Sequence, residues 1–189
     1  MFTELITDTA AAPKSTATAV EEPPRERENF DAVVIDDNTT LRRRGVYALH
    51  NMPANRRIVY ETPQLSCDTP CWYRPGRDHR VALAWISLSR ETSVSLQEQF
   101  ITARGLTKHD RRIKGLTKDQ RLQLEAFVMD YAFADVSGSR RYVYRIASHF
   151  RHACGRCANA KFWIDPNDPN HISVTLLRPV NQGEELYIT

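Results

Sequence analysis

The first part of the chain alternates between short apolar runs and turn-forming residues, a pattern typical of β-strands. A β-branched run lies in residues 30–38 and ends in Asp-Asp-Asn. Two more runs flank the turn sequence Asn-Met-Pro-Ala-Asn in residues 42–63. Residues 67–80 are rich in proline and polar residues, and we expect a loop there. The pattern therefore predicts three strands of one small, irregular sheet, followed by a loop.

The middle of the chain changes to helical periodicity. Thr117 followed by Gln120 has the spacing of a capping box at a helix N-terminus. Apolar residues then recur every three or four positions, which predicts a helix with one buried stripe. The residues of this stripe are Leu122, Ala126, Met129 and Phe133. After a break at Ser-Gly-Ser, a second stripe predicts another helix. Its residues are Val143, Ile146, Ala147 and Phe150.

The last part of the chain returns to strand-like alternation. Ile172, Val174 and Leu176 are apolar and alternate with polar residues, as expected for a half-buried strand. The run Lys-Phe-Trp-Ile-Asp precedes it, and the turn sequence Pro-Asn-Asp-Pro-Asn separates the two. We therefore expect a β-hairpin.

Composition limits the size and class of the protein. The chain has 189 residues, of which 41% are hydrophobic and 26% charged, so it is long enough for one domain with a sizeable core. Residues 9–28 are small, polar or charged, with three prolines and no aromatic residue. Such a segment buries too little apolar surface to fold, and we predict a disordered tail at 1–29. No apolar run approaches the roughly 20 residues of a membrane helix, so we expect no membrane association.

Charge argues against nucleic acid as the main partner. The net charge of +3 is mild. Residues 104–121 contain seven Lys or Arg and two Asp, but no aromatic residue that would stack on bases. We interpret this segment as a solvated helical face. Residues 1–20 lack the features of a secretory or mitochondrial leader, so we expect an intracellular protein, in the nucleus or the cytoplasm.

The four cysteines, Cys67, Cys71, Cys154 and Cys157, form two close pairs. Four thiolates are enough for a tetrahedral zinc site if the pairs meet in space. The alternative, which we favour, is thiols without metal, so we assign no metal ligand and do not expect zinc. A thioredoxin-like pair needs a strand-to-helix context, whereas Cys154 is expected to follow a helix and precede a strand. His149, near the same helix end, is interpreted as interacting with the last helical carbonyls.

Three separated segments, in this order, resemble the SET domain of protein-lysine methyltransferases. Residues 42–63 resemble the opening pattern of Gly-x-Gly, an aromatic residue, Ala, a turn and a strand that ends in Glu. Residues 145–160, with His-x-Cys and Asn159, are similar to the Asn-His-Ser-Cys-x-Pro-Asn signature. Residues 172–189 match the closing pattern of a strand, Arg and Gly-Glu-Glu-Leu. The resemblance covers residues 31–189.

The resemblance implies a fold class, a cofactor and a reaction. The fold would be mainly β with inserted helices (α+β), a SET-like fold of small irregular sheets with a knot-like crossing near the C-terminus. It would span residues 30–189, with a helical insert at about 85–140. Such proteins transfer a methyl group from S-adenosylmethionine to a lysine of a protein substrate, histones among them. A catalytically inactive SET-like module that binds a protein partner or chromatin is the alternative.

The resemblance also implies where the cofactor binds. The loop at 44–47 would lie along its methionine portion, and residues 151–153 at its adenine end. Asn159 would hold the crossing together through side-chain to backbone hydrogen bonds. The cofactor-binding residues are thus Arg44, Gly45, Val46, Tyr47, Arg151, His152, Ala153 and Asn159.

The chain departs from the family pattern in several places. Arg43 replaces the first glycine of Gly-x-Gly, Arg151 replaces the Asn before His, and the loop after His152 has six residues instead of four. Tyr187 comes too early to match the family's channel tyrosine, so we assign no catalytic residue. The sequence therefore predicts either that the protein continues past residue 189 or that this member is truncated and does not turn over substrate.

Overall fold

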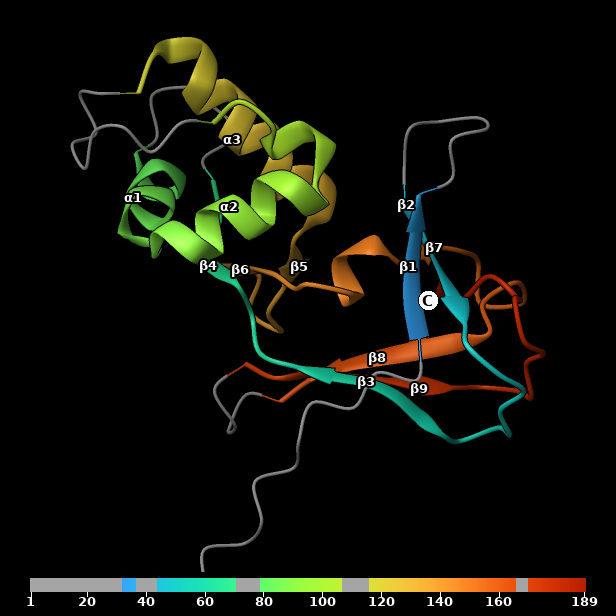
Figure 1. Ribbon diagram of the computed structural model, residues 1–189. Coiled ribbons are helices and arrows are strands. Elements are labelled where there is room, and N and C mark those ends of the chain that lie inside the picture. Colours follow the sequence, from blue (N-terminus) through green and yellow to red (C-terminus); the bar gives the residue numbers. More distant parts are fainter. Residues whose placement is uncertain (1–31, 37–43, 71–78, 107–115, 166–169) are drawn as a thin grey trace, which may run out of the picture.

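The structure, a computed structural model, describes residues 32–36, 44–70, 79–106, 116–165 and 170–189. Within these residues the strands form three small sheets, and the helices gather on one side of them (Figure 1). The strands are β1 (Ala32–Asp36), β2 (Arg44–Ala48), β3 (Arg57–Glu61), β4 (Leu65–Asp68), β5 (Phe133–Ala134), β6 (Arg140–Val143), β7 (Arg151–His152), β8 (Ala160–Ile164), β9 (Ile172–Leu176) and β10 (Tyr187–Ile188). The helices are α1 (Arg80–Ser87), α2 (Arg90–Gln99) and α3 (Lys118–Tyr131), with the 3-10 helices η1 (Ile101–Ala103) and η3 (Ala147–His149). The fold has the predicted class, small sheets with inserted helices. The predicted tail at 1–29 lies outside the described residues.

The predicted strands and the hairpin are present, but they do not form one sheet. β8 and β9 pair antiparallel, and the alternating apolar residues of β9 are fully buried. β3 pairs with β9, whereas β1 and β2 form a separate two-stranded sheet. Met52 forms a β-bridge with Val180, so the chain leaves the first sheet before β3 begins. The prediction of a single sheet for the first three strands was therefore wrong.

Helix α3 begins where its cap predicts. The Thr117 hydroxyl accepts a hydrogen bond from the Gln120 N–H, and Gln120 Oε1 accepts one from the Thr117 N–H, at 3.2 and 2.9 Å. The predicted buried stripe was wrong, since Ala126 is exposed and Phe133 lies in β5. The buried residues of the helix are Leu124, Phe127 and Val128. These residues lie three and four positions apart, so they share one face of the helix, and Phe127 on that face packs against other aromatic residues of the insert.

The predicted helix through Val143 and Phe150 was also wrong. The segment contains strand β6, which pairs with β4, and then the short helix η3. Val143 is apolar because it faces the helices as a strand residue, opposite Leu65. The first residues of the predicted loop at 67–80 likewise belong to β4, and the residues at 71–78 lie outside the described part of the chain.

The core has two parts. One lies within the sheets and includes the buried faces of β3, β8 and β9. The other lies under the helices, where Trp85, Phe100 and Phe127 are fully buried. The ring of His149 stacks on Phe100 with centroids 4.3 Å apart, and this contact connects η3 to the helices. His149 is thus a packed residue between the two parts. No described helix has both the length and the apolar character needed to cross a membrane.

Glu61, the last residue of β3, is a buried carboxylate with 1% of its surface exposed. Its Oε1 atom accepts hydrogen bonds from the backbone N–H groups of Ala147 at 2.6 Å and Ile146 at 3.1 Å. The first N–H groups of a helix have no partner within the helix, and the bonds to them offset the cost of burying the charge. Glu61 therefore fixes where η3 begins and how the chain approaches β7.

We expect Glu61→Ala to lower the free energy of unfolding by about 3 kcal/mol, because it leaves two buried N–H groups without a partner. Urea unfolding followed by circular dichroism measures this loss. The matched control is Glu91→Ala, at an exposed position in the first turn of α2, which should cost less than about 1 kcal/mol. Equal losses for the two variants would contradict the role given to Glu61.

Candidate functional site

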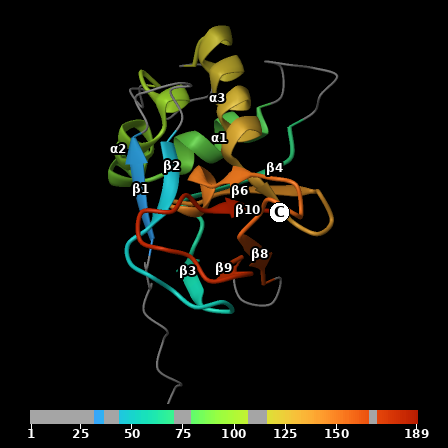
Figure 2. The same cartoon turned by 90° about the vertical axis from the view of Figure 1, so that its right-hand side faces the viewer.

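The site lies where the C-terminal segment crosses the loop between β7 and β8. β10 pairs in parallel with both strands, with Tyr187 opposite Arg151, and Ile188 opposite His152 and Ala160. Figure 2 shows β10 at the centre of the molecule, with β3, β8 and β9 on one side and the helices on the other. The chain segment from β7 to β8 thus holds the last strand between its two ends.

Asn159 connects the two crossing segments through its side chain. It is 1% exposed. Its Oδ1 atom accepts a hydrogen bond from the Tyr187 N–H at 2.7 Å. Its Nδ2 atom donates to the Glu185 carbonyl at 2.8 Å and to Glu184 Oε1 at 3.3 Å. The amide therefore bonds the backbone of the C-terminal segment on both sides of Leu186.

The C-terminal segment also lies against β2. Tyr47 and Glu185 form a β-bridge, and the Leu186 N–H donates to the Val46 carbonyl at 2.8 Å. A Cβ atom at Gly45 would lie 2.9 Å from Tyr47 Cε2 and 3.0 Å from Glu185 Oε1. The first contact is shorter than real Cβ atoms show and the second is tighter than most, so a side chain at position 45 would displace the ends of Tyr47 and Glu185.

Glu185 is the centre of a small polar cluster. Its Oε1 atom forms an ion pair with Arg151 Nη1 at 3.2 Å, and the side chains are 17% and 29% exposed. The Tyr187 hydroxyl donates a hydrogen bond to Glu185 Oε2 at 2.5 Å. That bond is the main reason that the pKa of Tyr187 is raised above its ordinary value; burial and the charge of Glu185 add to this, and Arg151 opposes it. The cluster therefore contains a carboxylate, a guanidinium and a protonated phenol.

The structure brings most of the expected cofactor-binding residues to this crossing. Gly45 and Tyr47 face Glu185, Arg151 pairs with it, and the Ala153 N–H donates to the Ile188 carbonyl at 2.9 Å. His152 is exposed, with its ring 6.1 Å from Phe133 and 6.4 Å from Phe162, centroid to centroid.

Two of the expected cofactor-binding residues, Val46 and Arg44, contact their neighbours through backbone groups. The side chain of Val46 is fully buried in the core cluster that also contains Leu186 and Ile188, and its carbonyl accepts the Leu186 N–H. Arg44 begins β2, where its backbone pairs with Asp36.

Sequence reasoning missed the residue at the centre of the cluster. Glu185 belongs to the Gly-Glu-Glu-Leu motif, but the motif alone does not indicate that its carboxylate meets Arg151. The signal was the unusual Arg151 itself, since a half-buried cation requires a nearby carboxylate. Tyr187 is half-buried beside the same carboxylate.

The cysteines do not form a metal site within the described part of the chain. Cys67 is buried beneath the helices, whereas Cys154 and Cys157 are exposed in the loop between β7 and β8. No group of three or more His, Cys, Asp or Glu that could hold a metal was found among the described residues. Cys71 lies outside them, so the expectation of thiols without metal stays a prediction.

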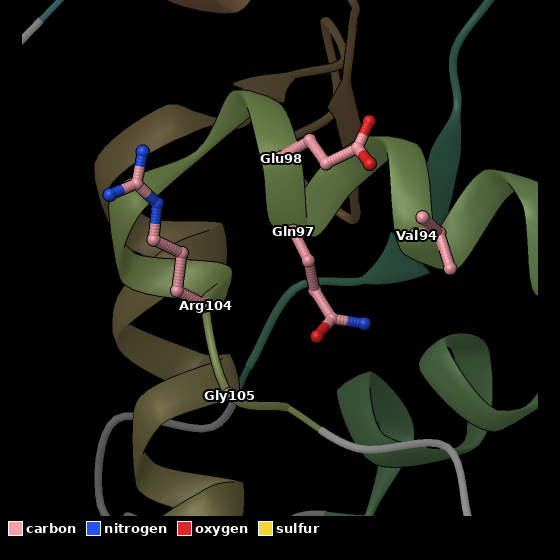
Figure 3. Close-up of a pocket in the computed structure, with 5 residues that line it drawn as sticks. All are labelled: Val94, Gln97, Glu98, Arg104 and Gly105. Carbon is pink, nitrogen blue, oxygen red and sulfur yellow. The ribbon is translucent and has the colours of Figure 1, made fainter.

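A separate pocket lies among the helices, away from the crossing. It is lined by Val94, Gln97 and Glu98 of α2 and by Arg104 and Gly105 (Figure 3). Figure 3 shows Gln97 and Glu98 leaving α2 in different directions, with Arg104 and Gly105 on the chain that follows η1. The pocket is wide open and has no residue of the crossing among those lining it, so it is not part of the candidate site.

We expect Asn159→Ala to lower the free energy of unfolding by about 3 kcal/mol, because three hydrogen bonds are lost and two of their partners, the Tyr187 N–H and the Glu185 carbonyl, are backbone groups left unpaired. Urea unfolding is the measurement. Asn181→Ala, in an exposed turn of the same C-terminal segment, is the control and should cost less than about 0.5 kcal/mol. A loss at Asn159 no larger than at Asn181 would contradict the role of Asn159 in the crossing.

Comparison with solved structures finds chains of similar fold at low sequence identity. A Plasmodium falciparum protein assigned as a histone methyltransferase shares 12% identity, with a TM-score of 0.42 over 85% of this chain and 92% of that chain. Apo ctPRC2 with mutations in Ezh2 shares 14% identity, with a TM-score of 0.45 over 85% of this chain and 15% of that chain. The SET domain of LSMT, bound to lysine and AdoHcy, shares 12% identity, with a TM-score of 0.48 over 85% of this chain and 49% of that chain.

Comparison with curated proteins gives no significant match. The family model of the SET domain, in contrast, matches residues 43–189, most of the chain and all of the crossing. The chain therefore belongs to the SET-domain family.

Proposed function

We propose that this chain is an S-adenosylmethionine-dependent protein-lysine N-methyltransferase. The observation that carries the proposal is the crossing of β10 between β7 and β8, within a SET domain matched over residues 43–189. This crossing brings together the three sequence segments that carry the family resemblance, two of which the resemblance assigns to the cofactor. Proteins of this family generally use S-adenosylmethionine and act on lysines of proteins.

The side chains at the crossing carry charges that complement those of the methionine end of the cofactor. An amino acid carries an ammonium and a carboxylate, and the pair of Glu185 and Arg151 presents the complementary charges 3.2 Å apart. This assigns the Arg151 side chain to the methionine end, whereas the resemblance implied that residues 151–153 lie at the adenine end. Gly45 is buried against Tyr47 and Glu185, so it brings the start of β2 close to this pair. The exposed His152, beside Phe133 and Phe162, offers a planar ring to a nucleobase. These are the residues that would hold the cofactor.

S-adenosylmethionine supplies an electrophilic methyl group on a sulfonium ion. The chain's own residues would bind and orient it. Asn159 keeps the two crossing segments in register, and positioning of this kind contributes much of the rate in a displacement reaction. Tyr187 keeps its proton and its hydrogen bond to Glu185, so that the carboxylate stays in place. No residue of the chain is assigned a catalytic role.

One observation favours the alternative, a SET module that binds a protein partner without turnover. Arg151 forms an ion pair with Glu185 Oε1, and Tyr187 donates a hydrogen bond to Oε2, so the carboxylate already has partners within the chain. A zwitterionic ligand must therefore compete with the Arg151–Glu185 pair. If the pair is too stable to open, the crossing serves as structure, and the protein binds a partner through another surface.

The substrate in this proposal is a protein that carries a lysine, with histones as the first candidates to test. The protein is proposed to act inside the cell, in the nucleus or the cytoplasm, where such substrates occur. Both statements rest on the family.

Calorimetric titration with S-adenosylmethionine tests cofactor binding. We expect binding to the wild type, and Arg151→Ala should weaken the affinity about tenfold, because a charge-assisted contact to the carboxylate is lost. Lys161→Ala removes the same charge from an exposed position on β8 and should leave the affinity within about twofold. Tighter binding to Arg151→Ala, or no binding to the wild type, would support the inactive module.

Transfer of a labelled methyl group to histones and to total cell protein tests the reaction itself. We expect incorporation into lysine with the wild type and less with Arg151→Ala, since the cofactor is held less well. Lys161→Ala should retain the wild-type rate at saturating cofactor. Cofactor binding without incorporation into any protein would overturn the enzymatic proposal while leaving the cofactor site intact.

A further inference from the structure

The loop between β7 and β8 carries two exposed thiols that face each other. The Sγ atoms of Cys154 and Cys157 lie 3.1 Å apart. The backbone holds them in this arrangement, because the N–H groups of Cys157 and Ala158 both donate to the Cys154 carbonyl, at 2.8 and 2.9 Å. The turn thus orients two sulfur atoms toward each other at the surface, where solutes can reach them.

The two thiols differ in acidity. The pKa of Cys154 is lowered, chiefly because its thiolate accepts a hydrogen bond from the Cys157 thiol, and the same contact raises the pKa of Cys157. Nearby backbone N–H groups also favour the Cys154 thiolate. Since the thiolate is the nucleophile in disulfide exchange, Cys154 attacks first and Cys157 is the second, resolving thiol.

We propose that Cys154 and Cys157 form a dithiol–disulfide site that exchanges with small-molecule disulfides of the glutathione type. The Cys154 thiolate attacks one sulfur of the disulfide, and the other sulfur leaves as a thiolate. Cys157 then loses its proton to solvent and attacks Cys154 Sγ, which expels the second thiolate. Two protein thiols are oxidised to one disulfide, and one small disulfide is reduced to two thiols.

The geometry of the loop favours closure of this pair. A disulfide needs its sulfur atoms at about 2.05 Å, so the thiols must approach by roughly 1 Å. Both ends of the loop are held by β10, where the Ala153 N–H donates to the Ile188 carbonyl and the Asn159 N–H to the Tyr187 carbonyl. The loop is therefore held closed before oxidation. Cys67 is 4% exposed, so solutes cannot reach it as they reach the loop thiols.

Trypsin provides a direct test because it cleaves after Arg151, Arg156 and Lys161. The two cysteines fall on separate peptides, 152–156 and 157–161, unless a disulfide joins them. The full-length protein is incubated with oxidised glutathione, the remaining thiols are alkylated, and the digest is analysed by mass spectrometry with and without reductant. We expect the joined pair of peptides as the main oxidised product, separated by reductant.

Two variants test the order of the steps. Cys157→Ser lacks the resolving thiol and should accumulate glutathione on Cys154. Cys154→Ser should react more slowly, by about threefold or less, because Cys157 lacks the backbone N–H groups that favour the Cys154 thiolate. Both positions are exposed, and circular dichroism verifies that the variants are folded.

Three results of the oxidation experiment would overturn the proposal. These are alkylation of both thiols in the wild type after oxidation, glutathione that stays on the wild-type protein without closure, or pairing of either loop cysteine with Cys67 or Cys71. Equal reaction rates for the two single variants would overturn the assignment of Cys154 as the first nucleophile. None of these results depends on cofactor binding or methyl transfer.

Discussion

The candidate site depends on the buried amide of Asn159. β10 is two residues long, so its backbone pairing with β7 and β8 supplies few hydrogen bonds of its own. The Asn159 side chain adds one acceptor and two donor contacts to the same segment. An amide buried without hydrogen-bond partners would cost free energy, so burial of the Asn159 side chain is favourable only when the C-terminal segment is in place. The crossing and the burial of Asn159 therefore require each other.

The position of the charged groups follows from this crossing. Once β10 is in register, Tyr187 lies opposite Arg151, and Glu185 two residues earlier lies opposite Tyr47. The carboxylate of Glu185 then meets the guanidinium that this chain has in place of the family's asparagine. Arg151 is thus accommodated by a residue of the closing motif. Arg151 adds to the site a positive charge that an asparagine would not carry.

Features set by neighbours in the sequence were predictable, and those set by distant contacts were not. The cap of α3 and the hairpin of β8 and β9 depend on residues a few positions apart. The false helix near Val143 arose because Val143 lies in β6 and pairs with Leu65 of β4, far earlier in the chain. The resemblance indicated which segments form the site. It could not indicate the contact between Arg151 and Glu185, which depends on strand register.

The lengthened loop after His152 carries a pair of thiols, while the crossing keeps its hydrogen bonds. Compared with the family pattern, the extra residues lie between two backbone bonds to β10, one from Ala153 and one from Asn159. A turn bonded to the Cys154 carbonyl takes up the added length, so the second cysteine lies beside the first at the surface. Asn159 keeps its partners because the loop changes only between its anchors. The thiol pair therefore lies between these two anchors to β10, and oxidation of the loop should leave both anchors in place.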